Sequence, residues 1–425
     1  MVHSLPIPLL LLLQFLALIP TVYSNNIISR AAQRTHKVAA RHTHAIARDL
    51  RVAFGAVLVS EPPQQLLANG RTVYCKSNAV GSSGTGQGNS NSSSGTGTPT
   101  KSASAGSPTA SAVSPWKLAE AHNGSEFFQG WSFDVGADPT HGVVDYLDQS
   151  QATSAGLAYV NSAGNAIMAV DTTNNLSGNR ESVRITTNSQ YNQALWILNA
   201  IHMPTGCGVW PAFWTNGPNW PAGGEIDIVE GVNDYTNNQA TIHTNPGCSM
   251  PTSNTTALGV TGELVAQTNC AAAETGNQGC GMRSNSNVSF GAAFNNNGGG
   301  VYASKLDDTG VSIHFWPSAQ VPSDILAGTP QPSSWGAPFA AWPASTCDPS
   351  TFFYNQSAIF DTTLCGDWAG SAWNSTGVPG QEQSCAQRTG YSTCESFVMA
   401  EGSAFSQACM FNWEVKSVNI YQYKP

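Results

Sequence analysis

Charged side chains are scarce in this 425-residue sequence and make up only 10% of it. Positive charge is especially scarce in residues 115–425, which contain 24 acidic and 8 basic residues and carry a net charge of −16. Proteins that bind nucleic acid need a basic surface that displaces the counterions of the phosphates. The composition therefore argues against a nucleic-acid partner, whereas a neutral polymer would not be repelled.

Long apolar runs are absent after the N-terminus. Residues 1–24, MVHSLPIPLLLLLQFLALIPTVYS, have a polar start, an apolar core and small residues before a cleavage site after Ser24, as a signal peptide does. The alternative, an uncleaved membrane anchor, is disfavoured because the run is short and interrupted by prolines. The C-terminal SVNIYQYKP lacks the apolar tail of a lipid-anchor signal. We therefore expect a secreted protein, extracellular or in the cell wall, without stable membrane association.

Cys-x-x-Cys pairs are also absent, so a zinc site has little support, and we expect neither a bound metal nor a cofactor. The ten cysteines instead indicate disulfides in an oxidising compartment. Cys75 stands apart, and the other nine can form at most four bridges among themselves unless Cys75 joins one of them; the pairing cannot be read from spacing. Acceptor sequences for N-linked glycans occur at Asn91, Asn123, Asn175, Asn254, Asn287, Asn355 and Asn374.

Large apolar side chains are nearly missing from residues 81–114, a stretch rich in Gly, Ser and Thr that we interpret as a flexible linker. Residues 25–80 before it are relatively basic, and we interpret them as an N-terminal leader or pro-segment. An alternative function for this segment is contact with a membrane or a glucan wall. Residues 115–425 are long enough for one large domain.

Helical periodicity is nearly absent from that domain. Short apolar or alternating runs separated by Gly, Asn and Pro predict strands within residues 156–173, 182–188, 194–203, 225–231, 239–244, 298–317 and 417–423. Many short strands of this kind favour an all-β sandwich, with a two-sheet β-jelly-roll as the expected fold. A β-propeller would show a repeat of about 40 to 50 residues, and none is found.

One predicted strand, within GGEIDIVEG (residues 223–231), contains three acidic residues, Glu225, Asp227 and Glu230. Side chains alternate along a strand, so Glu225 and Asp227 share a face, whereas Glu230 would point to the other. A one-residue β-bulge between Asp227 and Glu230 would return Glu230 to the first face, and bulges are common beside active sites.

Carboxylates this close repel one another, and the repulsion raises the pKa of one of them. An ionised carboxylate that attacks an anomeric carbon and a protonated one that serves the leaving oxygen, about 5 Å apart, are what a retaining glycosidase needs. Asp227 could hold the attacking carboxylate by a hydrogen bond. The alternatives are a Ca²⁺ site and a solvated strand end.

Aromatic residues surround this strand. Trp210, Trp214 and Trp220 lie just before it, and indole faces commonly stack on the rings of neutral sugars. Further candidates are Trp131, Trp316 and Trp368, although any of these tryptophans could instead belong to the core. His243 lies on the next predicted strand, where it either reaches the carboxylates or is purely structural.

The segment WPAFWTNGPNWPAGGEIDIVEGVND, followed by TIHT, resembles the secreted fungal endo-1,3(4)-β-glucanases of glycoside hydrolase family 16, of laminarinase type. The similarity extends over residues 115–425 and includes DPTHGVVDYL, SVRI, HMPTGCGVWPAFW, NNNGGGVYA and FDTTLCGDWAGSAW. It does not cover residues 25–114, and Cys409 departs from the aromatic or polar residue more usual in its segment.

This resemblance implies a β-jelly-roll (concanavalin A-like) sandwich with a long substrate cleft on its concave face, and a monomer that hydrolyses β-1,3 and/or mixed β-1,3/1,4 glucan with retention. Transferred by position, Glu225 is the nucleophile, Asp227 its assistant and Glu230 the acid/base. Trp210 and Trp214 would shape the cleft. Independently of the resemblance, we include His243 and Trp368 among the candidates for substrate binding. A cell-wall β-glucan transglycosylase and a non-hydrolytic β-glucan-binding protein are the alternative functions, although the binding proteins characteristically lack these glutamates.

Overall fold

The computed structural model describes residues 114–424, apart from 266 and 403–410. The predicted signal peptide (1–24), leader (25–80) and linker (81–114) therefore lie outside the described residues except for Ser114, as do Cys75 and Cys409. Within the described ranges, no helix has both the length and the apolar character that crossing a membrane requires.

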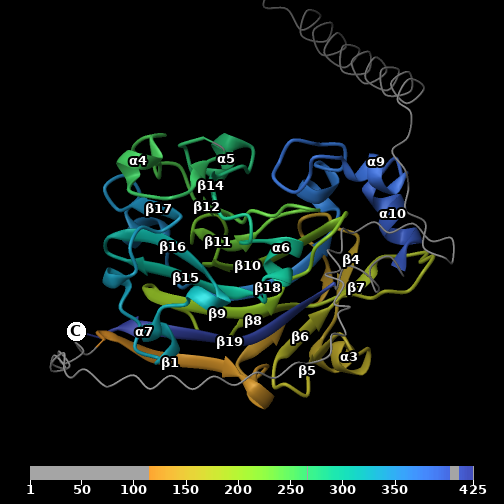
Figure 1. Ribbon diagram of the computed structural model, residues 1–425, viewed down its shortest axis with the longest axis horizontal. Coiled ribbons are helices and arrows are strands. Elements are labelled where there is room, and N and C mark those ends of the chain that lie inside the picture. Colours follow the sequence, from red (N-terminus) through yellow and green to blue (C-terminus); the bar gives the residue numbers. More distant parts are fainter. Residues whose placement is uncertain (1–113, 266, 403–410, 425) are drawn as a thin grey trace, which may run out of the picture. The chain divides into compact units, whose positions relative to one another are not determined.

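Two eight-stranded sheets form the body of residues 114–424 (Figure 1). Sheet 1 has the order β13 (Glu263–Leu264), β14 (Cys280–Arg283), β12 (Gln239–His243), β11 (Glu225–Glu230), β10 (Val209–Asn216), β18 (Ser357–Leu364), β8 (Arg184–Thr187) and β2 (Trp131–Phe133). Sheet 2 has the order β17 (Ala340–Pro343), β16 (Gly310–Pro317), β15 (Gly300–Asp307), β9 (Ala194–His202), β19 (Asn412–Tyr423), β6 (Ala166–Ala169) and β5 (Ala158–Val160), and β1 (Trp116–Asn123) also pairs with β19. A small third sheet joins β3 (Gly136–Ala137), β4 (Val144–Tyr146) and β7 (Arg180–Ser182).

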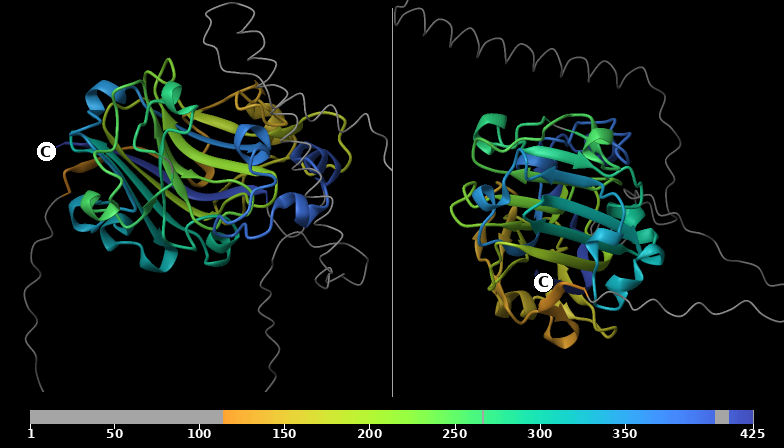
Figure 2. Two further views of the ribbon diagram at one scale, coloured as in Figure 1. Left: turned by 90° about the horizontal axis from the view of Figure 1, so that it is seen from above. Right: turned by 90° about the vertical axis from the view of Figure 1, so that its left-hand side faces the viewer.

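The core lies between the two large sheets. Alternation along the strands places Phe213, Ile226 and Phe360 of sheet 1 in one cluster of buried side chains with Trp196 and Tyr302 of sheet 2. Figure 2 shows the curved, layered strands from two further directions. Every predicted strand segment contains a strand of the structure, and the predicted all-β sandwich is confirmed.

Helices are short and lie in the connections. They are η1 (Gly124–Glu126), α3 (Gln149–Ser154), α4 (Thr255–Leu258), α5 (Ala272–Thr275), α6 (Gly291–Asn296), η2 (Ser318–Gln320), α7 (Ser323–Leu326), η3 (Pro332–Ser334), α8 (Pro349–Phe352), η4 (Gly366–Gly370), α9 (Cys385–Thr389) and α10 (Cys394–Ala400). In Figure 1 the loops with α4 and α5 rise on one side of β10–β12, and those with α9 and α10 on the other.

Four disulfides fasten these loops. Cys248–Cys347 joins the connection after β12 to the connection after β17, and Cys270–Cys280 joins the segment before β14 to the start of that strand. Cys207–Cys385 and Cys365–Cys394 tie α9 and α10 to the ends of β10 and β18. All eight cysteines within the described residues are thus paired, and their four bridges agree with the expected limit.

Candidate active site

A β-bulge in β11 brings the three acidic residues of this strand to one face. Trp214 of β10 pairs with Asp227, but Phe213 pairs with Val229, so that Ile228 is the extra residue of the bulge. The predicted bulge is confirmed. Its consequence is that Ile228 and Val229 are both fully buried in the core, while Asp227 and Glu230 point to the opposite face of the sheet.

The glutamates differ from Asp227 in their exposure to solvent. Glu225 and Glu230, at the two ends of β11, are half-buried, whereas Asp227 between them is only 2% exposed. A molecule approaching this face therefore meets two carboxyl groups, with a third beneath them. We call Glu225, Asp227 and Glu230 the acidic triad.

Each glutamate of the triad receives an indole N–H. Trp220 donates to Glu225 Oε2, and Trp210 donates to Glu230 Oε1 over 2.8 Å. Trp220 is 45% exposed and reaches Glu225 because the chain turns back just before β11 at Gly224, whose φ is +76°. A Cβ at Gly224 would overlap the carbonyl of Phe352, so this turn requires glycine. The sequence placed both tryptophans near the triad but did not predict either hydrogen bond.

His243 lies beside the triad on β12. It pairs directly with Glu225 across the sheet, and its Nε2 is 3.3 Å from Asp227 Oδ2. This position agrees with the prediction that His243 could reach the carboxylates.

Glu225, Asp227 and His243 also offer ligand atoms within 4.8 Å of one another, a spacing that a cation could use. The Trp220 N–H occupies one position on Glu225 Oε2 and leaves the other oxygen of this carboxyl group available.

A row of residues across four strands adds a fourth carboxyl group. Glu230 pairs with Ala212, Ala212 with Asp361, and Asp361 with Arg184. The small Ala212 leaves only a methyl group between the Glu230 and Asp361 positions.

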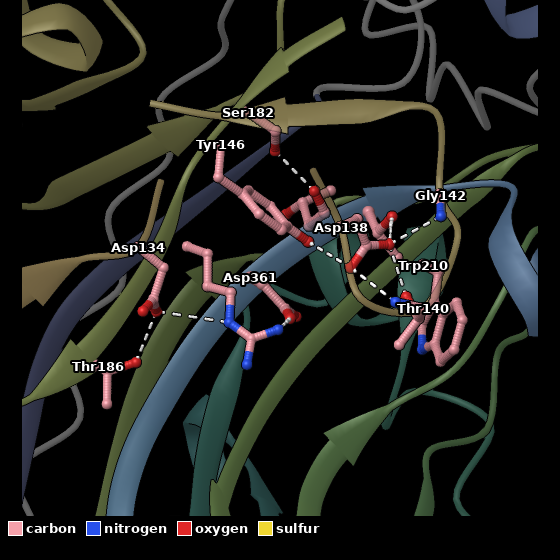
Figure 3. Close-up of polar contacts among 12 residues, drawn as sticks. Asp134, Asp138, Thr140, Gly142, Tyr146, Ser182, Thr186, Trp210 and Asp361 are labelled. Carbon is pink, nitrogen blue, oxygen red and sulfur yellow. Dashed lines mark hydrogen bonds and ion pairs between the residues drawn. The ribbon is translucent and has the colours of Figure 1, made fainter. Parts of the chain in front are cut away.

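Arg184 is fixed by its own neighbours. Its Nη1 is 3.6 Å from Asp361 Oδ2 and its Nε is 3.4 Å from Asp134 Oδ2 (Figure 3). The guanidinium also lies over the ring of Trp214, 5.1 Å from the ring centre. Sequence reasoning missed Arg184 and Asp361, and the only available signal was a charge within each of two apolar strand segments.

Burial and mutual repulsion raise the pKa values of the carboxyl groups in the site. Burial, followed by repulsion from Asp227, raises the pKa of Glu225 to about 8, while His243 and the Trp220 N–H act in the opposite direction. Burial raises the pKa of Asp227 to about 7 and, together with the neighbouring carboxyls, raises that of Glu230 well above its ordinary value. Burial likewise raises the pKa of Asp361 to about 7, against the attraction of Arg184.

The other predicted aromatic residues divide into two groups. Trp214 pairs with Asp227 on the face of the triad, and Trp368, from η4, meets Trp210 edge-on with ring centres 5.8 Å apart. Trp131, by contrast, is 5% exposed and packs on Phe360 in the core, so its assignment as a sugar-binding candidate is wrong.

Trp316 belongs to the other large sheet. It lies on β16 of sheet 2 and stacks on His314, so it is not among the residues around the triad, and this candidate is wrong as well.

The arrangement combines a proton donor, an acceptor and a potential nucleophile. Glu230 faces solvent and its pKa is raised well above the ordinary value, which favours its protonated form. Glu225 has two neighbours that favour its ionised form, and both glutamates lie on one sheet face. Such a pair can protonate a leaving group while it attacks the carbon that the group leaves.

Comparison with known proteins identifies relatives of this domain. A family model described as XgeA-like, catalytic GH16 domain, matches residues 131–421. The chain is 42% identical over 311 residues to a probable glycosidase of Schizosaccharomyces pombe, covering 72% of this chain and 70% of that protein. It is 40% identical over 312 residues to a probable endo-1,3(4)-beta-glucanase of Aspergillus fumigatus, covering 72% of this chain but only 46% of that protein.

Two of the solved structures that resemble this domain are members of the same family. Laminarinase 16A of Phanerochaete chrysosporium, with beta-glucans in its donor and acceptor sites, is 36% identical with a TM-score of 0.64, over 72% of this chain and 99% of that one. An elongating GH family 16 beta-1,3-glucosyltransferase is 35% identical with a TM-score of 0.63, over 72% of this chain and 100% of that one. Both similarities agree with the predicted β-jelly-roll.

Proposed function

This chain belongs to glycoside hydrolase family 16, and from this premise we propose that it is an endo-β-glucanase that cleaves β-1,3 and/or mixed β-1,3/1,4 glucan with retention of configuration. The chain spans about half the length of the curated endoglucanases that it matches, so their substrates serve here as support for a proposal. The observation that carries the proposal is the bulge at Ile228, which gives Glu225 and Glu230 a common face with Asp227 between them.

In the first step, the carboxylate of Glu225 attacks the anomeric carbon, and the bond from that carbon to the glycosidic oxygen breaks. Glu230 donates its proton to this oxygen, so the leaving chain departs as a neutral alcohol and the enzyme is left as a glycosyl ester. His243 and the Trp220 N–H favour the ionised form of Glu225 that the attack requires. The Trp210 N–H holds one oxygen of Glu230, which orients the other toward the substrate.

In the second step, Glu230 takes a proton from water, the water oxygen attacks the anomeric carbon, and the ester bond breaks to regenerate Glu225. Formation of the ester removes the charge of Glu225, one of the charges that raise the pKa of Glu230. The pKa of Glu230 therefore falls when its role changes from acid to base. Asp227 would assist Glu225 when Asp227 itself is protonated, because the negative charge of an ionised Asp227 raises the pKa of Glu225.

A β-glucan transglycosylase is the second candidate, favoured by the similarity to the elongating glucosyltransferase. It shares the first step, but a sugar hydroxyl replaces water in the second. The residues of the triad serve both reactions equally, and the acceptor side of the site decides between them.

Product analysis tests the proposal. The secreted, oxidised protein would be incubated with unbranched β-1,3-glucan, laminarin, mixed-linkage β-1,3/1,4-glucan, cellulose and xylan, and reducing ends and chain lengths would be followed. Early release of oligosaccharides from the β-1,3-containing glucans is expected, with β-configured new ends by NMR. Lengthened chains without a net gain of reducing ends would establish the transglycosylase, and binding without any change in the polymers would overturn both.

The role of Glu225 is tested separately. Glu225→Gln should abolish turnover while leaving substrate binding and fold intact, because it removes the attacking charge and little volume. In Glu225→Ala, added azide should restore cleavage and give a glycosyl azide of inverted configuration, since azide enters the space of the lost carboxylate. Full activity of Glu225→Gln would refute the mechanism.

A further inference from the structure

A polar pocket of about 380 Å³ lies away from the acidic triad. It is formed by the β8–β9 connection, by Asn355 two residues before the start of β18, and by the end of β19, whose position is near the C-terminus marked in Figure 1. Five of its side chains are amides, Gln190, Asn192, Gln193, Asn355 and Gln422. The other two are Tyr191 and Tyr423, so the lining contains no charged residue.

The lining offers unused hydrogen-bonding groups beside an open aromatic ring. Within residues 114–424 as described, the side-chain amides of Gln190 and Gln422 form no hydrogen bond with protein, and each provides both donors and an acceptor. Tyr423 is 51% exposed, and Trp116 meets its ring edge-on with centres 5.5 Å apart. Uncharged amides and an accessible ring are the groups that bind the hydroxyls and the C–H face of a neutral saccharide.

The back of the pocket is rigidly built. Tyr191 and Gln356 exchange two backbone hydrogen bonds of 3.0 and 2.8 Å, and the Tyr191 hydroxyl donates to Glu120 over 3.0 Å. Asn192 Oδ1 accepts the Asn355 N–H over 2.8 Å. The lining residues are thus held in place without a ligand, and little ordering remains to oppose binding.

The same wall reaches the turn that precedes the triad. Gln356 Nε2 donates to the Gly223 carbonyl over 2.6 Å, two residues before Glu225, and Gln356 Oε1 accepts from Thr215 over 2.8 Å. Hydrogen bonds of Gln356, the neighbour of Asn355, therefore connect one side of the pocket to the turn before the triad, while Gln422 and Tyr423 on the other side belong to β19 of sheet 2.

We propose that this pocket is a second, non-catalytic binding site for a neutral saccharide. Two ligands share that chemistry. The first is a chain of the glucan substrate, and this assignment rests on the proposed function. The second is an N-linked glycan on Asn355, the first residue of the acceptor sequence Asn355–Gln356–Ser357. A glucan chain held here would keep the enzyme on its polymer between cleavage events.

The experiment measures binding of the full-length Glu225→Gln protein to insoluble β-1,3-glucan by depletion from solution. The protein would carry Asn355→Gln in one arm, to prevent glycosylation, and Asn355 in the other. Adding Tyr423→Ala or, as a milder change, Gln422→Ala should weaken binding at least fivefold. Tyr159→Ala, which removes a tyrosine that is 46% exposed and outside the pocket, should leave binding unchanged.

Activity separates the pocket from the proposed function. With Glu225 restored, the pocket variants should slow cleavage of insoluble polymer and leave cleavage of short soluble oligosaccharides unchanged. If the wild-type protein cleaved no glucan, the proposed function would fail, and the glycan arm would still test the pocket. In that arm, Tyr423→Ala should make the Asn355 glycan at least fivefold easier for an endoglycosidase to remove. Unchanged glucan binding together with unchanged glycan accessibility would overturn the inference.

Discussion

Replacement of Glu225 by its neutral isostere should stabilise the folded protein at neutral pH. The pKa of Glu225 is raised from 4.5 to about 8 in the folded state. At neutral pH, folding therefore requires Glu225 to bind a proton, whereas in the unfolded chain this residue is ionised. At pH 7, which lies 2.5 units above 4.5, this disfavours folding by about 3 kcal/mol, at ~1.36 kcal/mol for each unit. Glu225→Gln removes that cost and keeps an oxygen to accept the Trp220 N–H.

The sign of the pH dependence follows from the raised pKa. At pH 4, below the unfolded value, both states hold the proton and the cost is nearly absent; it grows as the pH rises toward the folded value of about 8. The variant should therefore melt about 6 °C above the wild type at pH 7, at ~2 °C per kcal/mol for a domain of this size, and within about 1 °C of it at pH 4.

Thermal unfolding followed by calorimetry at both pH values measures this difference. Glu126→Gln is the matched control, since it neutralises an exposed glutamate far from the triad in sequence and should change neither melting temperature appreciably. A Glu225→Gln protein that melted at or below the wild-type temperature at pH 7, or whose advantage did not shrink toward pH 4, would refute the electrostatic reasoning.

Three further predictions concern the surroundings of the triad and the loops. Trp210→Phe removes the N–H that lowers the pKa of Glu230, so the basic limb of the pH profile of kcat/KM should move upward by about one unit. Gly142→Ala should lower the free energy of unfolding in denaturant titration by about 2 kcal/mol or more, because its Cβ would overlap the Thr363 hydroxyl. Loss of Cys248–Cys347, 99 residues apart, should cost about 4–5 kcal/mol of that free energy, and loss of Cys270–Cys280, 10 apart, less than about 3 kcal/mol.

Each of these three predictions can be contradicted by a specific result. Trp214→Phe is the control for Trp210→Phe, because the Trp214 N–H has no partner among the described residues, and an equal shift of the limb in both variants would rule out the hydrogen bond as its cause. A Gly142→Ala protein as stable as the wild type would mean that the chain relaxes around the methyl group. Equal costs for the two disulfides would contradict the dependence on loop length.

The sheets and the bulge could be predicted because they follow from short-range patterns. Alternating apolar residues identified the strand segments, and three acids that could not share a regular strand face implied an irregularity between Asp227 and Glu230. His243 was placed near the triad because the next strand of an antiparallel meander lies alongside the previous one.

Contacts between distant segments could not be predicted in the same way. Arg184 and Asp361 meet because β8 pairs with β18, and no local signal identifies partners 177 positions apart. The Trp220 hydrogen bond depends on left-handed backbone at Asn219 and Gly224, which spacing does not reveal. Trp131 was misassigned because a tryptophan suits a core and a sugar-binding face equally well.

The four disulfides crosslink the connections and the short helices around sheet 1, with only Cys280 at the start of a strand, whereas the triad lies on paired strands in the middle of that sheet. Under the proposed function, the sheet would carry the residues of bond cleavage and the loops could vary independently of them. A loop can lengthen, shorten or be exchanged between its two crosslinked ends while the hydrogen-bonded ladder beneath keeps the acids in register. Such a division would allow changes in the loops without displacement of the three acidic residues.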